Sequence, residues 1–265
     1  MNRALWDGWT EIHERSQFYD IDAFRSGTLT LKPIEIEQVG DVSGKDLLHL
    51  QCHFGLDTLS WARKGARVTG VDFSERAIAL ANSLAAESGL DARFVCADVC
   101  DLPKNWTSQF DVVFTSYGVL PWLPDLARWA NTIARCLRPG GSFHLIEFHP
   151  FATMLDDDGC TLRHPYFHST EPNRYEVRGS YAEPSAAFTH DAYEWAHGFG
   201  DLFCALIAAG LTIHSFREFP FSPYNCFPFL EEREQGHWYV RGANVDVPLV
   251  FALHAGDMGM EVSRR

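Results

Sequence analysis

The sequence is poor in positive charge. It contains 22 lysine and arginine residues against 35 aspartate and glutamate residues, which gives a formal net charge of −13. The negative electrostatic potential of such a protein repels phosphate backbones, and the sequence contains no dense basic patch. We therefore expect no nucleic-acid partner, whereas a neutral or cationic small molecule suits the charge.

Long apolar runs and paired cysteines are also missing. No apolar run reaches the roughly 18 residues that span a bilayer, and the first residues lack the apolar stretch of a signal peptide. The 7 cysteines form no C-x-x-C pair, and several lie in apolar segments, where free cysteine behaves as a small hydrophobe. We expect a cytoplasmic protein with no membrane partner.

Strand-like and helix-like segments alternate from residue 45 onward. The predicted buried strands are 46–50, 66–72, 92–97, 110–116 and 142–148, and the predicted helices between them are 58–64, 74–88 and 126–137. Strands that alternate with helices in this way form right-handed crossovers and a mostly parallel sheet. Two later runs, 212–219 and 248–254, have no long helix between them, so we expect an antiparallel pair.

The segments around this alternating core define the predicted organisation. Residues 1–44 show three short helical patterns and are interpreted as an N-terminal helical cap on a core at 45–150. Residues 151–193 are rich in aromatic residues, proline and glycine and lack a helical period, so we expect an inserted lid. Residues 194–265 complete the core, with a helix at about 194–209 and the closing strand pair.

The turn after the first strand, His49-Leu50-Gln51-Cys52-His53-Phe54-Gly55, is the most informative stretch. In open α/β sheets, ligands bind beyond the carboxyl ends of the strands, where the strand order reverses. Asp72 ends the second strand, and a carboxylate there can accept both hydroxyl protons of a ribose. No G-x-G-x-x-G turn is present, which disfavours the alternative of an NAD-type oxidoreductase.

A series of segments resembles the class I S-adenosylmethionine-dependent methyltransferases over about residues 45–148. The segments are the first strand and turn, VDFS at 71–74, ADV at 97–99, FDVVFTSYGVL at 110–120 and LRPGG at 137–141. The resemblance implies a Rossmann-like, doubly wound α/β fold whose seven-stranded sheet is mostly parallel with an antiparallel last strand. It also implies S-adenosyl-L-methionine as cofactor and S-adenosyl-L-homocysteine as its product.

The same resemblance assigns residues to the nucleoside. Asp72 would hold the ribose, Phe73 would flank the adenine, and Asp98 with the Val99 amide would read the adenine edge. For Asp98 a turn-forming role is the alternative. The full predicted cofactor-binding set is Tyr19, Gln51, His53, Gly55, Asp72, Phe73, Ser74, Asp98, Val99 and Ser116.

The methionine part of the cofactor would lie at the first turn. Backbone carbonyls near Gln51 and Ser116 would bind its ammonium group, and Tyr19 would lie over the cofactor with Arg25 as a carboxylate partner. The family usually has an acidic residue and three glycines in this turn, whereas this sequence has only Gly55. We interpret this as a variant in which the side chains of Gln51 and His53 line the site. A non-catalytic cofactor-binding protein is the alternative.

Two residues are candidates for catalysis. His149 follows the fifth strand, and its ordinary pKa near 6.5 suits a general base; a hydrogen-bonded loop histidine is the alternative. Tyr117 follows the fourth strand and would orient the substrate or contact the methyl donor, with packing as the alternative. We expect no metal site, because the Asp156-Asp157-Asp158 run is typical of a solvated turn.

The aromatic residues of 151–193 and 220–247 suggest what the substrate is. In this fold both segments would border the crevice, where aromatic side chains would cover a small, aromatic or partly apolar molecule. The alternatives are a hydrophobic mini-core within the insertion and a homodimer contact. We favour a combination of these roles with substrate binding. The sequence thus predicts methyl transfer to a nitrogen or oxygen atom of such a molecule.

Overall fold

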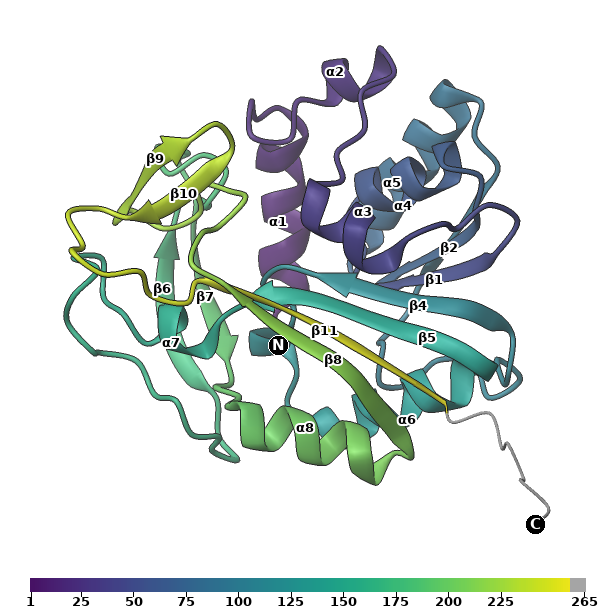
Figure 1. Ribbon diagram of the computed structural model, residues 1–265. Helices are drawn as coiled ribbons and strands as arrows, with labels where there is room; N and C mark the ends of the chain where they lie inside the picture. Colours follow the sequence, from purple (N-terminus) through teal and green to yellow (C-terminus); the bar gives the residue numbers. More distant parts are fainter. Residues whose placement is uncertain (258–265) are drawn as a thin grey trace.

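A seven-stranded sheet forms the centre of the molecule (Figure 1). The computed structural model describes residues 1–257, so residues 258–265, the end of the predicted segment 194–265, lie outside the described residues. The strands, in sheet order, are β3 (Ala92–Cys96), β2 (Arg67–Asp72), β1 (Asp46–Leu50), β4 (Phe110–Ser116), β5 (Leu137–Phe148), β11 (Val250–Asp257) and β8 (Leu211–Phe219).

The direction of the strands confirms the predicted fold class. β1 pairs in parallel with β2 and β4, and β4 pairs in parallel with β5. β11 is inserted between β5 and β8 and runs antiparallel to both. The strand order reverses between β1 and β4, because β2 and β3 lie on one side of β1 while β4 and β5 lie on the other. This reversal is the place where open α/β sheets bind ligands.

Helices cover both faces of the sheet (Figure 1). One face carries α3 (Pro33–Val39), α4 (Leu56–Arg63) and α5 (Glu75–Ser88), and the other carries α6 (Leu126–Cys136) and α8 (Phe199–Ala208). α1 (Arg3–Glu14) and α2 (Ile21–Arg25) precede them. Successive strand residues point to opposite faces, so Leu47 packs with Trp61 of α4 while Leu48 packs with Trp129 of α6.

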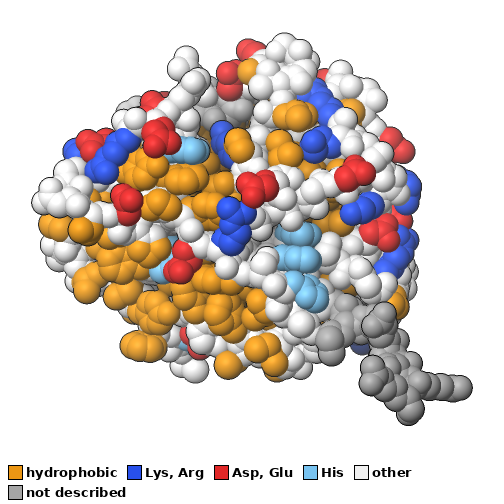
Figure 2. Space-filling view, in the orientation of Figure 1, with side chains coloured by type: hydrophobic (Ala, Val, Ile, Leu, Met, Phe, Trp, Pro, Cys, Tyr) orange, Lys and Arg blue, Asp and Glu red, His pale blue; other side chains and the backbone are white. Residues whose placement is uncertain are grey.

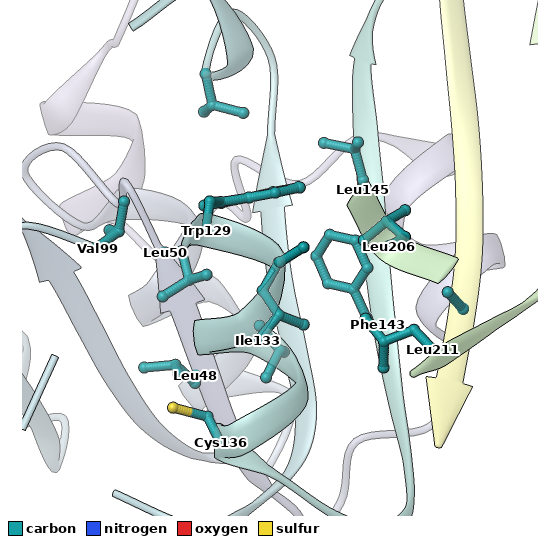
Figure 3. Packing of buried hydrophobic residues seen from close by; sticks show 14 of the residues in the cluster. Leu48, Leu50, Val99, Trp129, Ile133, Cys136, Phe143, Leu145, Leu206 and Leu211 are labelled. Atoms are coloured by element: carbon teal, nitrogen blue, oxygen red, sulfur yellow. The ribbon is translucent and has the colours of Figure 1, made fainter. Parts of the chain in front are cut away.

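The hydrophobic core on one face of the sheet lies under α6 and α8. Figure 3 shows Trp129, Ile133 and Cys136 of α6 close to side chains of the strands and of α8. Trp129 is fully buried and packs edge-on against Phe143 of β5. Burial of apolar area at about 25 cal/mol per Å² makes this contact layer a main source of stability.

Two two-stranded hairpins of the described chain lie outside the central sheet. β6 (Asn173–Arg178) pairs with β7 (Thr189–Glu194), and β9 (Leu230–Glu234) pairs with β10 (His237–Val240). A short helix, α7 (Pro150–Thr153), leads into the first of them. Both hairpins lie on the same side of the molecule, at the left of Figure 1. We call residues 151–194 the lid hairpin segment and 220–247 the second hairpin segment.

Three sequence-based expectations were wrong here. The helix expected from residue 194 starts only at Phe199, because Gly198 is its N-cap and Glu194 still pairs in β7. Residues 220–247, where no strand was predicted, contain β9 and β10, whose short sequences LEERE and HWYV show no clear alternation. The strand expected at 142–148 begins already at Leu137, so Arg138–Gly141 belong to β5.

Gly55 shows how tightly the first turn fits the sheet. Its φ is +79°, and a Cβ added there would lie 2.5 Å from the ring of Phe94 in β3. Gly89 follows α5 with a φ of +61°, but no atom lies within 4 Å of its added Cβ. The two glycines therefore share the left-handed backbone but differ in the space around them.

We expect Gly55→Ala to destabilise the protein more than Gly89→Ala. Both variants should lose roughly 1–2 kcal/mol because alanine is strained in the left-handed region. Gly55→Ala should lose roughly 1–3 kcal/mol more, because Phe94 must move from a packed position. Urea unfolding of the two variants measures the difference, and equal losses would show that the turn is not tightly packed against β3.

Candidate functional site

A large cavity lies at the carboxyl ends of β1, β2, β4 and β5. Its volume is about 1100 Å³, and it extends from the first turn to the lid hairpin segment and the second hairpin segment. Pockets of roughly 300–1,000 Å³ hold small ligands and cofactors. The cavity therefore has room for a nucleoside-sized group and a second small molecule.

The turn between β1 and α4 keeps a glycine-like backbone with few glycines. Gln51 has a φ of +54° and His53 a φ of +50°, and both lie in the left-handed region that favours glycine. Backbone strain of this kind costs roughly 1–3 kcal/mol per residue and persists where surrounding structure holds it. Here the Cys52 N–H donates to the Val71 carbonyl at 2.9 Å and holds the turn against β2.

Asp72 connects the turn to the next helix. Its carboxylate accepts the backbone N–H of His53 at 2.8 Å and that of Ser74 at 2.9 Å. The side chain is almost fully buried but lines the cavity. Burial raises the pKa of Asp72 to about 6, although the backbone donors oppose the shift. The carboxyl group is thus placed to accept hydrogen bonds from a ligand above the end of β2.

Glu147 performs a similar task at the end of β5. Its carboxylate accepts backbone N–H groups of Gly118, Val119 at 2.7 Å, Leu120 at 3.0 Å and Phe148 at 2.6 Å. The Gln51 amide reaches the same loop and donates to the Val119 carbonyl at 2.9 Å. The loop after β4 is therefore fixed from both sides.

Tyr117 begins this loop and lines the cavity. Its φ is +46°, a strained value for a tyrosine, and its N–H donates to the Ile146 carbonyl at 2.7 Å. Its buried hydroxyl has no hydrogen-bond partner within residues 1–257. Burial, together with the nearby carboxyl groups of Glu35 and Asp57, raises the pKa of Tyr117. The phenol is neutral, and it lies close to the buried carboxyl group of Glu35.

The helix α1 closes the cavity above the first turn. His13 Nδ1 lies 2.9 Å from His53 Nε2, and the Trp6 ring packs edge-on against His53. Burial lowers the pKa of His13 to about 3, so this histidine pair is neutral. Trp9 donates from its indole N–H to the Gly179 carbonyl at 2.9 Å, which joins α1 to the lid hairpin segment.

Two tyrosines form a second contact between the N-terminal residues and the lid hairpin segment. The hydroxyl groups of Tyr19 and Tyr181 hydrogen-bond each other, and both rings lie beside His13. Tyr181 also packs edge-on against Phe18. The cavity is therefore roofed by aromatic rings on the side of the first turn.

The structure brings most of the predicted site residues together. The predicted residues that line the cavity are Tyr19, Gln51, His53, Gly55, Asp72, Phe73, Ser116 and Tyr117. Ser74 does not line it; its hydroxyl caps α5 by accepting the Ala77 N–H at 3.0 Å. The same hydroxyl donates to Asp7 of α1 at 2.6 Å.

His149 is not where a general base was expected. Its Nδ1 accepts the Phe151 N–H at 3.0 Å, and its Nε2 lies 2.8 Å from Glu218. The ring packs against Phe199 and Phe251, and it does not line the cavity. The turn into α7 directs the side chain away from the cavity toward α8 and β8, so we withdraw His149 as a catalytic candidate.

Asp98 and Val99 also lie outside the cavity lining. The Asp98 carboxylate is exposed and accepts the Cys100 N–H at 2.8 Å, which is the turn-forming alternative. Val99 is buried in the core beside α6. Arg25 is likewise absent from the lining, because it forms ion pairs with Asp22 and Glu87 on the outer surface.

Comparison with known proteins supports the arrangement. Residues 47–141 match the methyltransferase domain family. The ubiquinone biosynthesis O-methyltransferase of Bordetella pertussis is 31% identical over 138 residues, which is 52% of this chain and 54% of that protein. Its counterpart in Aeromonas salmonicida is 29% identical over 146 residues, 53% of this chain and 61% of that protein. The chain thus spans little more than half the length of these relatives.

The fold agrees with solved structures as well. A crystal structure of an S-adenosylmethionine-dependent methyltransferase from Mesorhizobium loti has a TM-score of 0.57 and 20% identity, with 87% of this chain and 99% of that chain covered. Its likeness concerns the fold.

Some residues of the site were not predicted from the sequence. Glu147 ends an apolar strand as Asp72 does, and this shared signal could have identified it. Nothing in the sequence indicated the contact of His13 with His53. Three charged residues also gather near Tyr117, from segments with no recognisable motif: Lys32, Glu35 and Asp57.

The surface around the domain shows where apolar side chains gather. Figure 2 shows hydrophobic side chains grouped on the side of the two hairpin segments and of α8. Within residues 1–257, no helix is both long and apolar enough to cross a membrane. In the same part of the chain, no three His, Cys, Asp or Glu side chains gather as metal ligands.

We expect Glu147→Gln to destabilise the loop after β4. The glutamine side chain would place its NH2 group where one Glu147 oxygen now accepts backbone N–H groups, so donors would face donors. Unsatisfied buried donors cost roughly 1–3 kcal/mol each. Glu37→Gln is the matched control, because Glu37 forms only an exposed ion pair with Arg217. Thermal unfolding compares the two variants, and an equal melting temperature for both would contradict the role given to Glu147.

Proposed function

We propose that this protein binds S-adenosyl-L-methionine and transfers its methyl group to a nitrogen or oxygen atom of a small, aromatic or partly apolar molecule. The observation that carries the proposal is the buried Asp72 carboxylate, which lines a large cavity at the point where the strand order reverses. The match of residues 47–141 to the methyltransferase domain family supports it. The names of the O-methyltransferase relatives agree with the same chemistry.

The residues of the cavity fit the cofactor in several respects. Asp72 can accept ribose hydroxyl protons, and Phe73 lies beside it in the cavity wall. Gln51 Oε1 and His53 Nδ1 are buried without a partner among the described residues, so both are available to hydrogen-bond a ligand. The turn retains its left-handed residues at 51 and 53, which supports cofactor binding despite the missing glycines.

Methyl transfer asks little covalent chemistry of the protein. The bound sulfonium would supply an electrophilic methyl carbon. The chain must orient the acceptor, which can lower a barrier by about 7–11 kcal/mol. Tyr117 has a neutral hydroxyl without a partner in the described chain, and it is fixed by the loop that Glu147 holds. We assign it the positioning of the acceptor.

The roof of the cavity supports an aromatic or partly apolar acceptor. Trp6, Trp9, Tyr19 and Tyr181 lie close together above the first turn. Such rings supply apolar area and can stack on an aromatic ligand. The protein takes a small molecule in this proposal, and the expected homodimer and cytoplasmic location stay predictions.

Asp72→Asn should weaken the binding of S-adenosyl-L-homocysteine at pH 7.5 by about ten- to a hundredfold, because it removes a charged acceptor worth roughly 1.5–3 kcal/mol. Wild-type affinity should fall as the pH drops through about 6, because the carboxyl group then becomes protonated. Calorimetry at pH 7.5 and 5.5 measures both effects. Asp41→Asn, in an exposed turn, is the control.

The variant should also lose the pH dependence that Asp72 causes in the wild type. An unchanged affinity of Asp72→Asn at pH 7.5 would show that the ribose lies elsewhere.

A direct assay tests methyl transfer itself. We expect the protein, supplied with S-adenosyl-L-methionine carrying a deuterated methyl group, to label members of a set of small aromatic amines and phenols. Mass spectrometry detects the labelled products together with S-adenosyl-L-homocysteine. Cofactor binding without any labelled product would favour a non-catalytic cofactor-binding protein, and binding of NAD alone would contradict the proposed function.

A further inference from the structure

Glu194 is a carboxylate on the inner face of the lid hairpin segment. It is the last residue of β7 and lies opposite Asn173 of β6. Residues directly opposite each other in an antiparallel pair point to the same side, and the next pair on this side, Tyr175 and Ala192, packs toward α1. Glu194 lines the cavity.

Its surroundings are mostly aromatic and apolar. The neighbouring residue, Trp195, is buried. Its backbone N–H donates to the Pro121 carbonyl at 2.8 Å, and this hydrogen bond joins β7 to the loop before α6. Trp122 of the same loop belongs to the apolar group that packs around Trp9 and Ala192. Burial raises the pKa of Glu194 to about 7, and no charge or donor opposes the shift.

The other mostly buried carboxylates of the cavity have partners. Asp72 and Glu147 accept backbone N–H groups. Asp57 accepts the Thr30 hydroxyl and lies near Lys32. Within residues 1–257, by contrast, the Glu194 carboxylate forms neither a hydrogen bond nor an ion pair with another residue.

The Glu194 side chain is half-buried. A half-buried carboxylate without a partner is partly desolvated, which costs free energy, and a cation that binds beside it offsets this cost. The aromatic rings around this part of the cavity would in turn favour an organic cation over a hydrated metal ion. Glu194 lines the cavity, and among residues 1–257 it forms no ion pair with a basic residue.

We propose that Glu194 binds an alkylammonium group of the substrate, so that the substrate is an alkyl amine with an aromatic or partly apolar body. While it is protonated this nitrogen has no lone pair, so it holds the molecule in place and does not accept the methyl group. This inference rests on the proposed function and narrows its substrate class. The ammonium group would donate to the Glu194 carboxylate, and the apolar part of the molecule would lie among the rings of Trp195, Tyr175 and Trp122. A neutral or anionic analogue would leave the carboxylate without a partner.

Three probes of similar shape test the inference. They are phenethylamine, 2-phenylethanol and 3-phenylpropionate, titrated calorimetrically into the protein at pH 8, with and without S-adenosyl-L-homocysteine. At this pH the carboxylate is ionised and an alkyl amine is still protonated. Phenethylamine should bind about ten- to a hundredfold more tightly than the other two, as expected for a hydrogen bond between charged groups.

Glu194→Gln should remove this preference because it keeps the shape of the side chain but not its charge. Glu171→Gln should retain it, because Glu171 lies in the same segment but is exposed and does not line the cavity. Equal binding of the three probes to the wild type, no binding of any of them, or an unchanged preference in Glu194→Gln would overturn the inference. The ranking in the wild type decides the matter even if the variant does not fold.

The same titrations separate this inference from the proposed function. A protein that binds S-adenosyl-L-homocysteine but ranks the three probes equally contradicts only the amine site. A protein that prefers phenethylamine but binds no S-adenosyl-L-homocysteine contradicts only the methyl transfer.

Discussion

The carboxylate of Asp72 joins the ends of two neighbouring strands. One of its oxygens accepts the N–H of His53 in the turn after β1, and the other accepts the N–H of Ser74 at the start of α5. Backbone donors rather than a basic side chain therefore stabilise this buried charge, so the carboxyl group stays at the cavity wall. The turn, the helix start and the floor of the cavity all depend on this pair of hydrogen bonds.

The turn itself replaces glycine with residues that make contacts. Gln51 and His53 accept the strain of a left-handed backbone, and in return their side chains reach the Val119 carbonyl and His13. A glycine would remove the strain but also both contacts. The first turn is thereby connected to the loop after β4 and to α1, which a glycine-rich turn could not achieve through side chains.

The carboxylates of the cavity differ in their partners. Asp72 and Glu147 are stabilised by backbone N–H groups, so their partners come from the same fold elements that they hold in place. Glu194 is different, because its strand lies on the apolar inner face of the lid hairpin segment. Together with the formal net charge of −13, this arrangement favours cationic over anionic ligands.

The sequence by itself determined the central sheet and much of the cavity floor. The strands and helices of residues 46–148 follow from local apolar runs, caps and glycines, and Asp72 stood out as a carboxylate at the end of an apolar strand. Only the tertiary structure decided where the side chains past the strand ends point. The His149 ring packs against Phe251, the Asp98 carboxylate accepts the N–H of its own turn, and Glu194 lines the cavity. The physical reason is that these orientations depend on packing and on hydrogen-bond partners far away in the chain, which no local pattern contains.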